Sequence, residues 1–342
     1  MRKRALLILT LFISVLSFYF FLFPDSNHAA KRFDIKFATV APEGSTWVKK
    51  IRYLDKRLDE KSNGQIRIKI YAGGIAGDEL DVLKKIRIGQ IHCAAFSGAG
   101  IAQILPMARI LDLPFLFRDR EEIDSVQKAL TPYFAEQFRE SGFEFLSWAE
   151  VGDVYLFSKK PIQRKADLIG RKVWTWTGDP VSKMTFSAMG TNPIPISITE
   201  VTTALNTNMI DTVYAPPLGA LALQWHHYVN YMTSFPITHA TAVVLISLKY
   251  FKSIPDKLSD LLKAESNIIM ADLTSELIQQ NGEAIRIIRE SGVNITPPPS
   301  ESELEEFYGI HNRVAQELAG VVYPKELLNR VYEILGRANR IQ

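Results

Sequence analysis

The chain has 342 residues, of which 47% are hydrophobic and 23% are charged, as expected for a folded globular protein and not for a disordered or collagen-like one. This length suits two domains of ordinary size better than one. The 40 basic and 37 acidic residues give a net charge of +3, which is too balanced to indicate nucleic acid as a partner. The single cysteine, Cys93, excludes a disulfide within the chain and a CxxC redox centre.

The first 30 residues have the layout of a secretory signal. Three basic residues, Arg2 to Arg4, precede a nearly continuous apolar run over 5–23, and polar and small residues follow over 24–30. The run is long for a signal peptide and just long enough to span a bilayer as a helix. Residues 1–30 are therefore expected to be a cleaved signal peptide or an N-terminal anchor. Both alternatives place the rest of the chain outside the cytoplasmic membrane.

Strands and helices alternate in the first part of the remaining chain. Apolar and polar residues alternate over 33–37 and over 66–70, which predicts two strands that each have one buried face. Helical spacing follows each of them, over 46–61 and 78–88, and a short buried strand is expected at 91–96. This order is typical of a parallel sheet with crossover helices.

The same order returns further along the chain. The pattern predicts a strand, two helices and another strand, at 170–176, 180–189, 200–208 and 211–214. Ser197 and Glu200 match a capping box for the second of these helices, with Thr199 as the alternative cap. The chain is therefore expected to form a second α/β unit.

A long helix is expected after an apolar strand at 242–248. The helical pattern begins near Pro255 and continues to Glu290. At 1.5 Å per residue, 35 residues make about 50 Å, which is longer than one domain is wide. The helix should therefore lie across two domains. Ser300 and Glu303 form another capping box, which precedes two amphipathic helices.

Catalytic motifs are absent from the sequence. It contains no G-x-S-x-G, H-E-x-x-H, G-x-G-x-x-G or G-K-[ST] pattern. His226 and His227 are adjacent, so on a helix their side chains would point about 100° apart and would not easily grip one metal ion. We therefore expect a protein that is not an enzyme and that has no cofactor and no metal ligands.

Aromatic residues lie where ligands bind in open α/β sheets, near the carboxyl ends of parallel strands. Trp174 and Trp176 are two residues apart on a predicted strand, so they share one face. Trp47 follows the first strand, Trp148 lies between the predicted units, and Tyr214 and Trp225 flank a Pro-Pro turn. Ordinary core packing is the alternative for each of them, but together they favour an apolar wall for a ligand.

The order of several segments resembles the extracytoplasmic substrate-binding protein of the tripartite ATP-independent periplasmic (TRAP) transporters. The resembling segments are residues 113–117, 160–162, 167–173, 189–195 and 200–211. The resemblance implies an α/β protein with the two-lobed periplasmic binding protein fold and a long helix that spans both lobes. It also implies a periplasmic protein that closes on a small-molecule ligand and delivers it to TRAP membrane permease subunits.

The resemblance and the element order together predict how the chain divides. After residues 1–30, residues 31–148 are expected to form the first part of lobe I, and residues 149–237 the main part of lobe II. Residues 238–290 should return to lobe I and include the spanning helix. Residues 291–342 should supply a strand and helices that pack on the lobes.

Three departures from the family pattern bear on the ligand. Where the family's carboxylate binders have an arginine that pairs with the ligand, this chain has Trp174. A second basic position falls within the apolar residues 154–157, and the family's asparagine is replaced by Ala215. Because a buried carboxylate without a cation costs several kcal/mol, we expect an apolar or amphipathic ligand. The expected ligand-binding residues are Trp47, Phe96, Trp148, Val154, Trp174, Trp176, Tyr214, Ala215 and Trp225.

Other functions stay open at this point. The ligand could be a carboxylate held by a different anchor or by a metal, and an anchored chain could act as a ligand sensor. The three departures from the family pattern also resemble a TRAP subgroup that works with a tetratricopeptide-repeat partner. An exported enzyme is the remaining class, for which the sequence shows no nucleophile with its base.

Overall fold

The computed structural model of the protein describes residues 31–337, so the predicted signal or anchor lies outside the described residues. Within this range, no helix has both the length and the apolar character needed to cross a bilayer. The strands are β1 (Phe33–Ala38), β2 (Ile66–Tyr71), β3 (Cys93–Phe96), β4 (Phe143–Ser158), β5 (Lys172–Trp176), β6 (Asn192–Ile196), β7 (Thr212–Ala215), β8 (Tyr231–Met232), β9 (Thr238–Ser247) and β10 (Asn294–Ile295).

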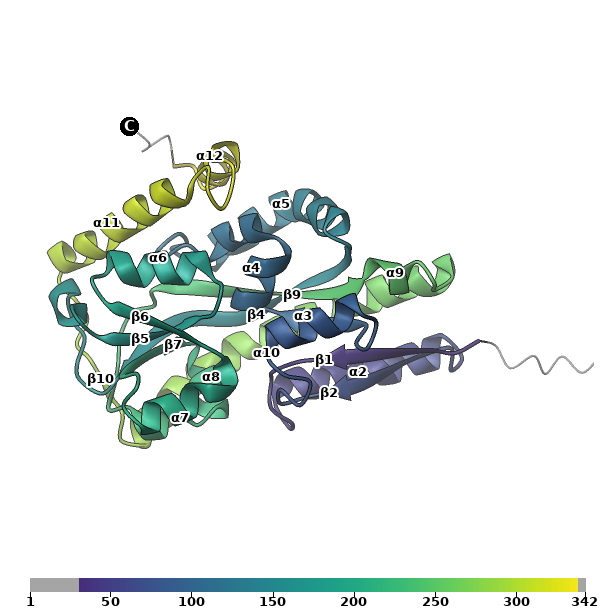
Figure 1. Cartoon of the computed structure of the whole chain (residues 1–342), viewed down its shortest axis with the longest axis horizontal. Helices are drawn as coiled ribbons and strands as arrows, with labels where there is room; N and C mark the ends of the chain where they lie inside the picture. The colour runs from purple at the N-terminus through teal and green to yellow at the C-terminus, as the bar shows by residue number, and fades with distance from the viewer. Residues whose placement is uncertain (1–30, 338–342) are drawn as a thin grey trace, which may run out of the picture.

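Helices connect most of these strands (Figure 1). The α-helices are α2 (Thr46–Lys61), α3 (Glu79–Arg87), α4 (Gly98–Ile104), α5 (Arg120–Glu140), α6 (Pro180–Ala188), α7 (Val201–Asn206), α8 (Pro217–Ala222), α9 (Leu248–Phe251), α10 (Asp256–Glu290), α11 (Glu301–Leu318) and α12 (Lys325–Ile334). Four short 3-10 helices complete the described elements: η1 (Pro106–Asp112), η2 (Lys165–Leu168), η3 (Ile198–Glu200) and η4 (Trp225–Tyr228).

The strands form two α/β lobes, as the alternation of strands and helices predicts. The strand order is β2-β1-β3-β9-β4-β7-β5-β6. Strand β1 pairs parallel with β2 and β3, and β5 pairs parallel with β6 and β7. We call the part built on β1–β3 the first lobe and the part built on β5–β7 the second lobe.

Two long antiparallel strands join the lobes. Strand β9 pairs with β3 of the first lobe and, along most of its length, with β4. The last residues of β4 pair with β7 and β8 of the second lobe. Because β4 runs from residue 143 to residue 158, it passes through the predicted boundary at residues 148 and 149. The exact division of the chain into lobes stays a prediction.

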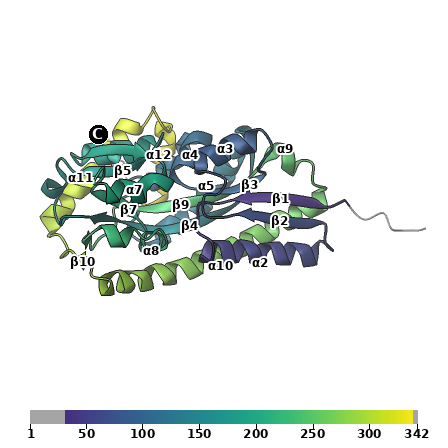
Figure 2. The ribbon, with the colours of Figure 1, turned by 60° about the horizontal axis from the view of Figure 1, so that its bottom comes forward.

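Helix α10 covers one side of both lobes (Figure 2). It has the predicted length of 35 residues and packs against α2, β4 and α8. Buried side chains recur on one face, among them Leu262, Ile269, Leu273 and Leu277, and these join the apolar core under β1. The amphipathic pattern therefore fixes the side of the protein on which the helix lies.

Local signals in the sequence place most helix ends correctly. Ser45 and Asp78 cap α2 and α3, and Ser300 and Glu303 form the predicted capping box of α11. The capping box predicted at Ser197 is wrong, because a 3-10 turn precedes α7 and Ser197 makes no cap bond. Its hydroxyl lies instead 2.9 Å from the hydroxyl of Thr199.

Candidate ligand-binding site

A cavity of about 430 Å³ lies between the two lobes, and we call it the interlobe chamber. Its walls come from the segments that follow β1, β2 and β3 on one side and β5, β6 and β7 on the other. Val151 and Val154 of β4 and Ala240 and Ala242 of β9 form its floor. The chamber therefore lies at the carboxyl ends of two parallel strand sets, where open α/β sheets bind ligands.

An aromatic cluster forms the wall on the side of the second lobe. The Trp174 ring centroid lies 5.0 Å from those of Trp176 and Tyr214 and 5.2 Å from that of Trp225. Phe186 extends the cluster, with its centroid 4.9 Å from that of Tyr214. Trp174 and Trp225 are buried in the core of this lobe, whereas Trp176 and Tyr214 are half-buried. The half-buried rings present the accessible aromatic surface.

Eight of the nine predicted site residues line the chamber. These are Trp47, Phe96, Val154, Trp174, Trp176, Tyr214, Ala215 and Trp225. The placement of Trp148 at the site is wrong. Its indole packs against Phe134, Phe138 and Phe145 and donates a hydrogen bond of 2.7 Å to the Thr131 hydroxyl. Helix α5 offers this ring both apolar partners and an acceptor, so it faces the core of the first lobe.

The site also contains a buried arginine that the sequence analysis missed. Arg109 of η1 lines the chamber and is 4% exposed. Its Nε and Nη2 atoms donate to the two oxygens of Asp179, at 3.2 and 2.8 Å. Its Nη1 atom lies against the carboxylate of Asp112. Asp179 caps α6 in the second lobe, so the ion pair crosses from one lobe to the other.

Glu79 is a second buried carboxylate that lines the chamber, besides Asp112. Its Oε1 atom accepts hydrogen bonds from the backbone N–H and the hydroxyl of Ser97, and its Oε2 atom accepts one from the N–H of Gly100. Burial raises the pKa of Glu79, although these hydrogen bonds and the charge of Arg109 oppose the shift. The carboxyl group of Glu79 therefore occupies the donors of the β3–α4 turn that could otherwise face an anionic ligand.

The arrangement of charges therefore differs from that of a site in which an unpaired cation can bind an anionic ligand. The guanidinium of Arg109 is paired with two carboxylates, and Glu79 adds a third acid nearby. Burial also raises the pKa of the Tyr214 hydroxyl, with the charge of Asp179 as a second cause. A signal for the pair of Arg109 with Asp112 exists in the sequence, since these are the two charged residues of the largely apolar segment 101–117 and lie one turn apart.

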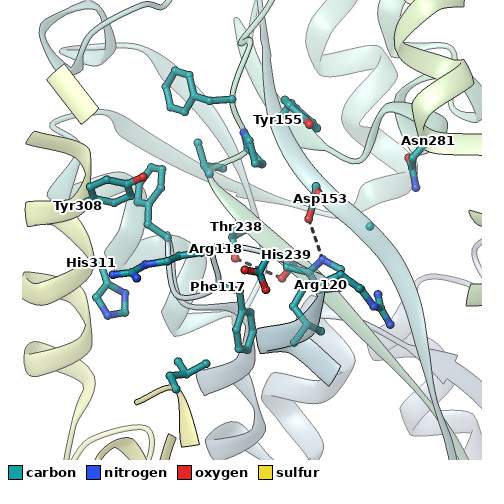
Figure 3. Close-up of a pocket in the computed structure, with 18 of the residues that line it drawn as sticks. Phe117, Arg118, Arg120, Asp153, Tyr155, Thr238, His239, Asn281, Tyr308 and His311 are labelled. Carbon is teal, nitrogen blue, oxygen red and sulfur yellow. Dashed lines mark hydrogen bonds and ion pairs between the residues drawn. The ribbon is translucent and has the colours of Figure 1, made fainter. Parts of the chain in front are cut away.

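The other face of β4 and β9 borders a larger groove of about 1110 Å³, which we call the rear groove. Helices α10, α11 and α12 form its sides, and Figure 3 shows part of its lining. Neighbouring residues of β4 face different hollows: Val154 faces the chamber, whereas Asp153 and Tyr155 face the groove. The same two strands therefore separate the chamber from the groove.

Charged side chains gather on the floor of the rear groove. His239 of β9 is buried, and its Nδ1 atom lies 3.0 Å from the Asp153 carboxylate on β4 (Figure 3). Its Nε2 atom lies 3.9 Å from Glu150, which also pairs with Arg120 of α5. These contacts tie β4 to β9 and to α5. Between residues 31 and 337, no group of three or more His, Cys, Asp or Glu side chains is placed to hold a metal ion.

Comparison with known proteins identifies the family. The sequence profile of the DctP family, described as bacterial extracellular solute-binding protein, family 7, matches residues 37–320. The chain belongs to this family. The resemblance to TRAP solute-binding proteins is thereby confirmed, and so is the expectation of a binding protein instead of an enzyme.

Two of the curated relatives are named for acidic solutes. The chain is 21% identical to the sialic acid-binding periplasmic protein of Vibrio cholerae over 278 residues, which cover 78% of this chain and 84% of that protein. Over 165 residues it is 30% identical to the 2,3-diketo-L-gulonate-binding periplasmic protein of Escherichia coli, covering 46% and 49% of the two chains. The chain spans between 47% and 60% of the length of the first curated relatives that it matches.

Solved structures confirm the two-lobed fold. A sugar acid binding protein from Advenella mimigardefordensis in complex with galactonate has a TM-score of 0.85 at 22% identity, covering 90% of this chain and 99% of that one. A TRAP periplasmic solute-binding protein from Desulfovibrio salexigens with bound orotic acid has a TM-score of 0.84 at 19% identity, with the same coverage. At these identities the likeness shows the fold alone.

Proposed function

We propose that this protein is the ligand receptor of a TRAP transporter and that the interlobe chamber holds an apolar or amphipathic small molecule. The lobes close around the ligand by bending β4 and β9, and the closed protein delivers it to the membrane permease subunits. Closure would bury most of the surface of a small ligand, because a chamber of about 430 Å³ lies within the usual range for such sites.

The proposed class of ligand rests on the ion pairs that Arg109 makes with aspartates. A ligand carboxylate needs a free guanidinium, but Arg109 already pairs with Asp179 and Asp112, both buried. Even with Glu79 protonated, the two aspartates outweigh this one positive charge. An additional buried anion would therefore be repelled, whereas ring faces such as those of Trp176 and Tyr214 accept apolar groups without an electrostatic cost.

A second candidate is an acidic solute. It is favoured by the presence of Arg109 in the chamber wall and by the relatives, which are named for acidic solutes. In this alternative the ligand carboxylate displaces Asp112 or Asp179 from the guanidinium. Replacing the displaced aspartate by asparagine would then tighten the binding of acids, since it removes a competitor for Arg109.

Thermal shift measurements with a matched ligand panel distinguish the two candidates. The panel contains decanol and decanoate on one side, and succinate, galactonate and sialic acid on the other. A ligand that binds only the folded state raises the melting temperature, and the increase grows with the logarithm of the ligand concentration divided by its Kd. We expect decanol to raise it by several degrees, decanoate to raise it less because its carboxylate finds no free cation, and the hydrophilic acids to leave it unchanged. The opposite pattern would establish the acidic solute.

A pair of tryptophan variants links binding to the chamber. Trp176→Ala removes a half-buried indole ring from the chamber wall. Trp148→Ala removes an equally half-buried indole ring that packs in the first lobe, outside the chamber. We expect Trp176→Ala to weaken the binding of the apolar ligand about tenfold or more and Trp148→Ala to leave it unchanged. Equal effects of the two substitutions would show that the chamber is not the ligand site.

The other parts of the proposed role follow from the resemblance and the N-terminal sequence. Residues 1–30 would direct the chain to the periplasm as a cleaved signal or as an anchor. A tetratricopeptide-repeat partner would accompany the permease, as in the TRAP subgroup that the departures resemble. Mass spectrometry of the mature N-terminus decides between signal and anchor, and co-purification with the permease subunits tests delivery.

A further inference from the structure

Gly98, the first residue of α4, lies directly against the indole of Trp176 from the other lobe. A Cβ atom added at Gly98 would lie 2.7 Å from both Cδ1 and Nε1 of that indole, a separation that real Cβ atoms do not show. The backbone of Gly98 is not in the left-handed region. Glycine is therefore required here for space, not for backbone conformation.

Neither side of this contact can easily move away. Trp176 packs on Trp174 of its own lobe, with ring centroids 5.0 Å apart. On the other side, the carboxyl group of Glu79 holds the turn around Gly98 through the N–H groups of Ser97 and Gly100. A side chain at position 98 would therefore be accommodated by separation of the lobes, since both local alternatives break packing or hydrogen bonds.

Two other contacts also join the first lobe to the second lobe. The side-chain amide of Gln103 donates to the carbonyl oxygen of Gly178 at 3.4 Å, so α4 is tied to the end of β5 at a second point. The ion pair between Arg109 and Asp179 is the other contact between the lobes. The described structure is therefore the closed arrangement, in which the Gly98–Trp176 contact is the sterically tightest of these three.

We propose that Gly98 and Trp176 form the latch of the closed state. The Trp176 side chain both forms part of the wall of the ligand chamber and packs against the backbone of Gly98 in the opposite lobe. A side chain at position 98 then holds the lobes apart and prevents the ligand from being enclosed. This inference rests on the proposed function only in taking the interlobe chamber as the ligand site.

Distances between spin labels test the latch without any assumption about ligand chemistry. One label is placed at Lys84→Cys on α3 and the other at Thr203→Cys on α7, both exposed positions in different lobes. The native Cys93 is buried and does not compete for the label. We expect the otherwise unchanged protein to populate the closed distance, and Gly98→Ala to lower the ratio of closed to open molecules about tenfold.

Two further variants make the test specific. Gly282→Ala is the control, because a Cβ at this position in α10 would meet nothing within 4 Å and the closed distance should be retained. The double variant Gly98→Ala/Trp176→Leu is the rescue, because the smaller side chain should let the lobes close again. The latch is wrong if the protein with native Gly98 lacks the closed distance, if Gly98→Ala keeps it, or if the double variant fails to restore it.

A binding measurement separates the latch from the ligand chemistry. The neutral apolar dye N-phenyl-1-naphthylamine serves as the probe, and Gly98→Ala should weaken its binding about tenfold relative to Gly282→Ala. If the dye does not bind while the distances change as expected, the apolar ligand is wrong and the latch stands. If the dye binds both variants equally and the closed distance persists in Gly98→Ala, the latch is wrong and the apolar ligand stands.

Discussion

The two faces of β4 and β9 border hollows of opposite character. On the chamber side, the strands contribute small apolar residues such as Val154 and Ala240, and the charged Arg109 is buried in ion pairs. On the side of the rear groove, they contribute Asp153 and His239, and Asp153 remains 56% exposed at its side chain. The alternation of side chains along a strand lets the same few residues build an apolar receptor face and a polar outer face.

This difference predicts how sensitive each side is to mutation. Charges on the chamber side are buried, so removing one partner leaves an uncompensated ion in a region of low dielectric constant. Exposed charges on the groove side, such as Asp153, have water as an alternative partner, so removing one of them costs little. The four predictions that follow test this comparison, from the largest expected effect to the smallest.

Removing the chamber guanidinium should have the largest effect. Arg109→Met leaves the buried carboxylates of Asp179 and Asp112 without their partner, and we expect a loss of about 3–5 kcal/mol in the free energy of unfolding. Arg118→Met, at an exposed arginine of the rear groove, is the matched control and should change it by less than about 0.5 kcal/mol. Urea denaturation measures both values. Similar losses in the two variants would contradict the comparison.

Trp148→Ala should destabilise the first lobe by about 3 kcal/mol, because its half-buried ring packs against three core phenylalanines and donates a hydrogen bond to Thr131. Trp47→Ala, at a half-buried ring of the chamber wall, should cost clearly less in stability. Urea denaturation again gives both free energies of unfolding. A larger loss for Trp47→Ala would show that the chamber ring belongs to the core and not to an open wall.

His311 should make stability depend on pH. Burial lowers its pKa from 6.5 to about 4, while its Nδ1 donates to the carbonyl of Pro114 and its Nε2 accepts from the Tyr332 hydroxyl. The unfolded chain therefore binds more protons between these values, so this contribution is complete above pH 6.5 and is lost as the pH falls toward 4. The loss is about 3 kcal/mol, at 1.36 kcal/mol per pKa unit.

The variant His311→Gln isolates this contribution. Urea denaturation at pH 7 and pH 4.5 should show a smaller loss of stability on acidification for His311→Gln than for the unsubstituted protein. His227→Gln, at an exposed histidine, serves as the control and should retain the full loss. If His311→Gln and His227→Gln lose the same stability on acidification, His311 is not the group responsible.

Asp153→Asn should have the smallest effect. The Asp153 side chain is more than half exposed, so its contact with His239 is worth less than about 1 kcal/mol. Glu150→Gln is the sharper comparison, because Glu150 is buried and pairs with Arg120. Melting temperatures of the two variants measure the contrast. A larger decrease for Asp153→Asn than for Glu150→Gln would reverse the expected order.

Patterns that depend on neighbouring residues were predictable from the sequence. Alternation located β1 and β2, and amphipathic spacing gave the length and span of α10. The Ser300–Glu303 capping box of α11 was predicted for the same reason, because both partners lie within four residues. The Ser197 box was not formed, since the chain enters α7 through a 3-10 turn that changes which backbone groups need a cap.

Contacts between distant segments were harder to predict. Trp148 looks like a site residue from its position near the predicted lobe boundary, but α5 supplies aromatic partners and Thr131 from earlier in the chain. The pairing of Arg109 with Asp179 joins residues 70 positions apart, and no local pattern encodes it. The contact between Gly98 and Trp176 likewise depends on how the two lobes close.

Native mass spectrometry tests the central claim about the chamber most directly. The protein is purified without denaturation and incubated with an equimolar mixture of decanol, decanoate, galactonate and orotate, and the bound mass is then identified. We predict that decanol is retained at one molecule per chain in preference to the three acids and that Trp176→Ala loses it. Retention of galactonate or orotate in place of the apolar molecules would contradict an apolar ligand.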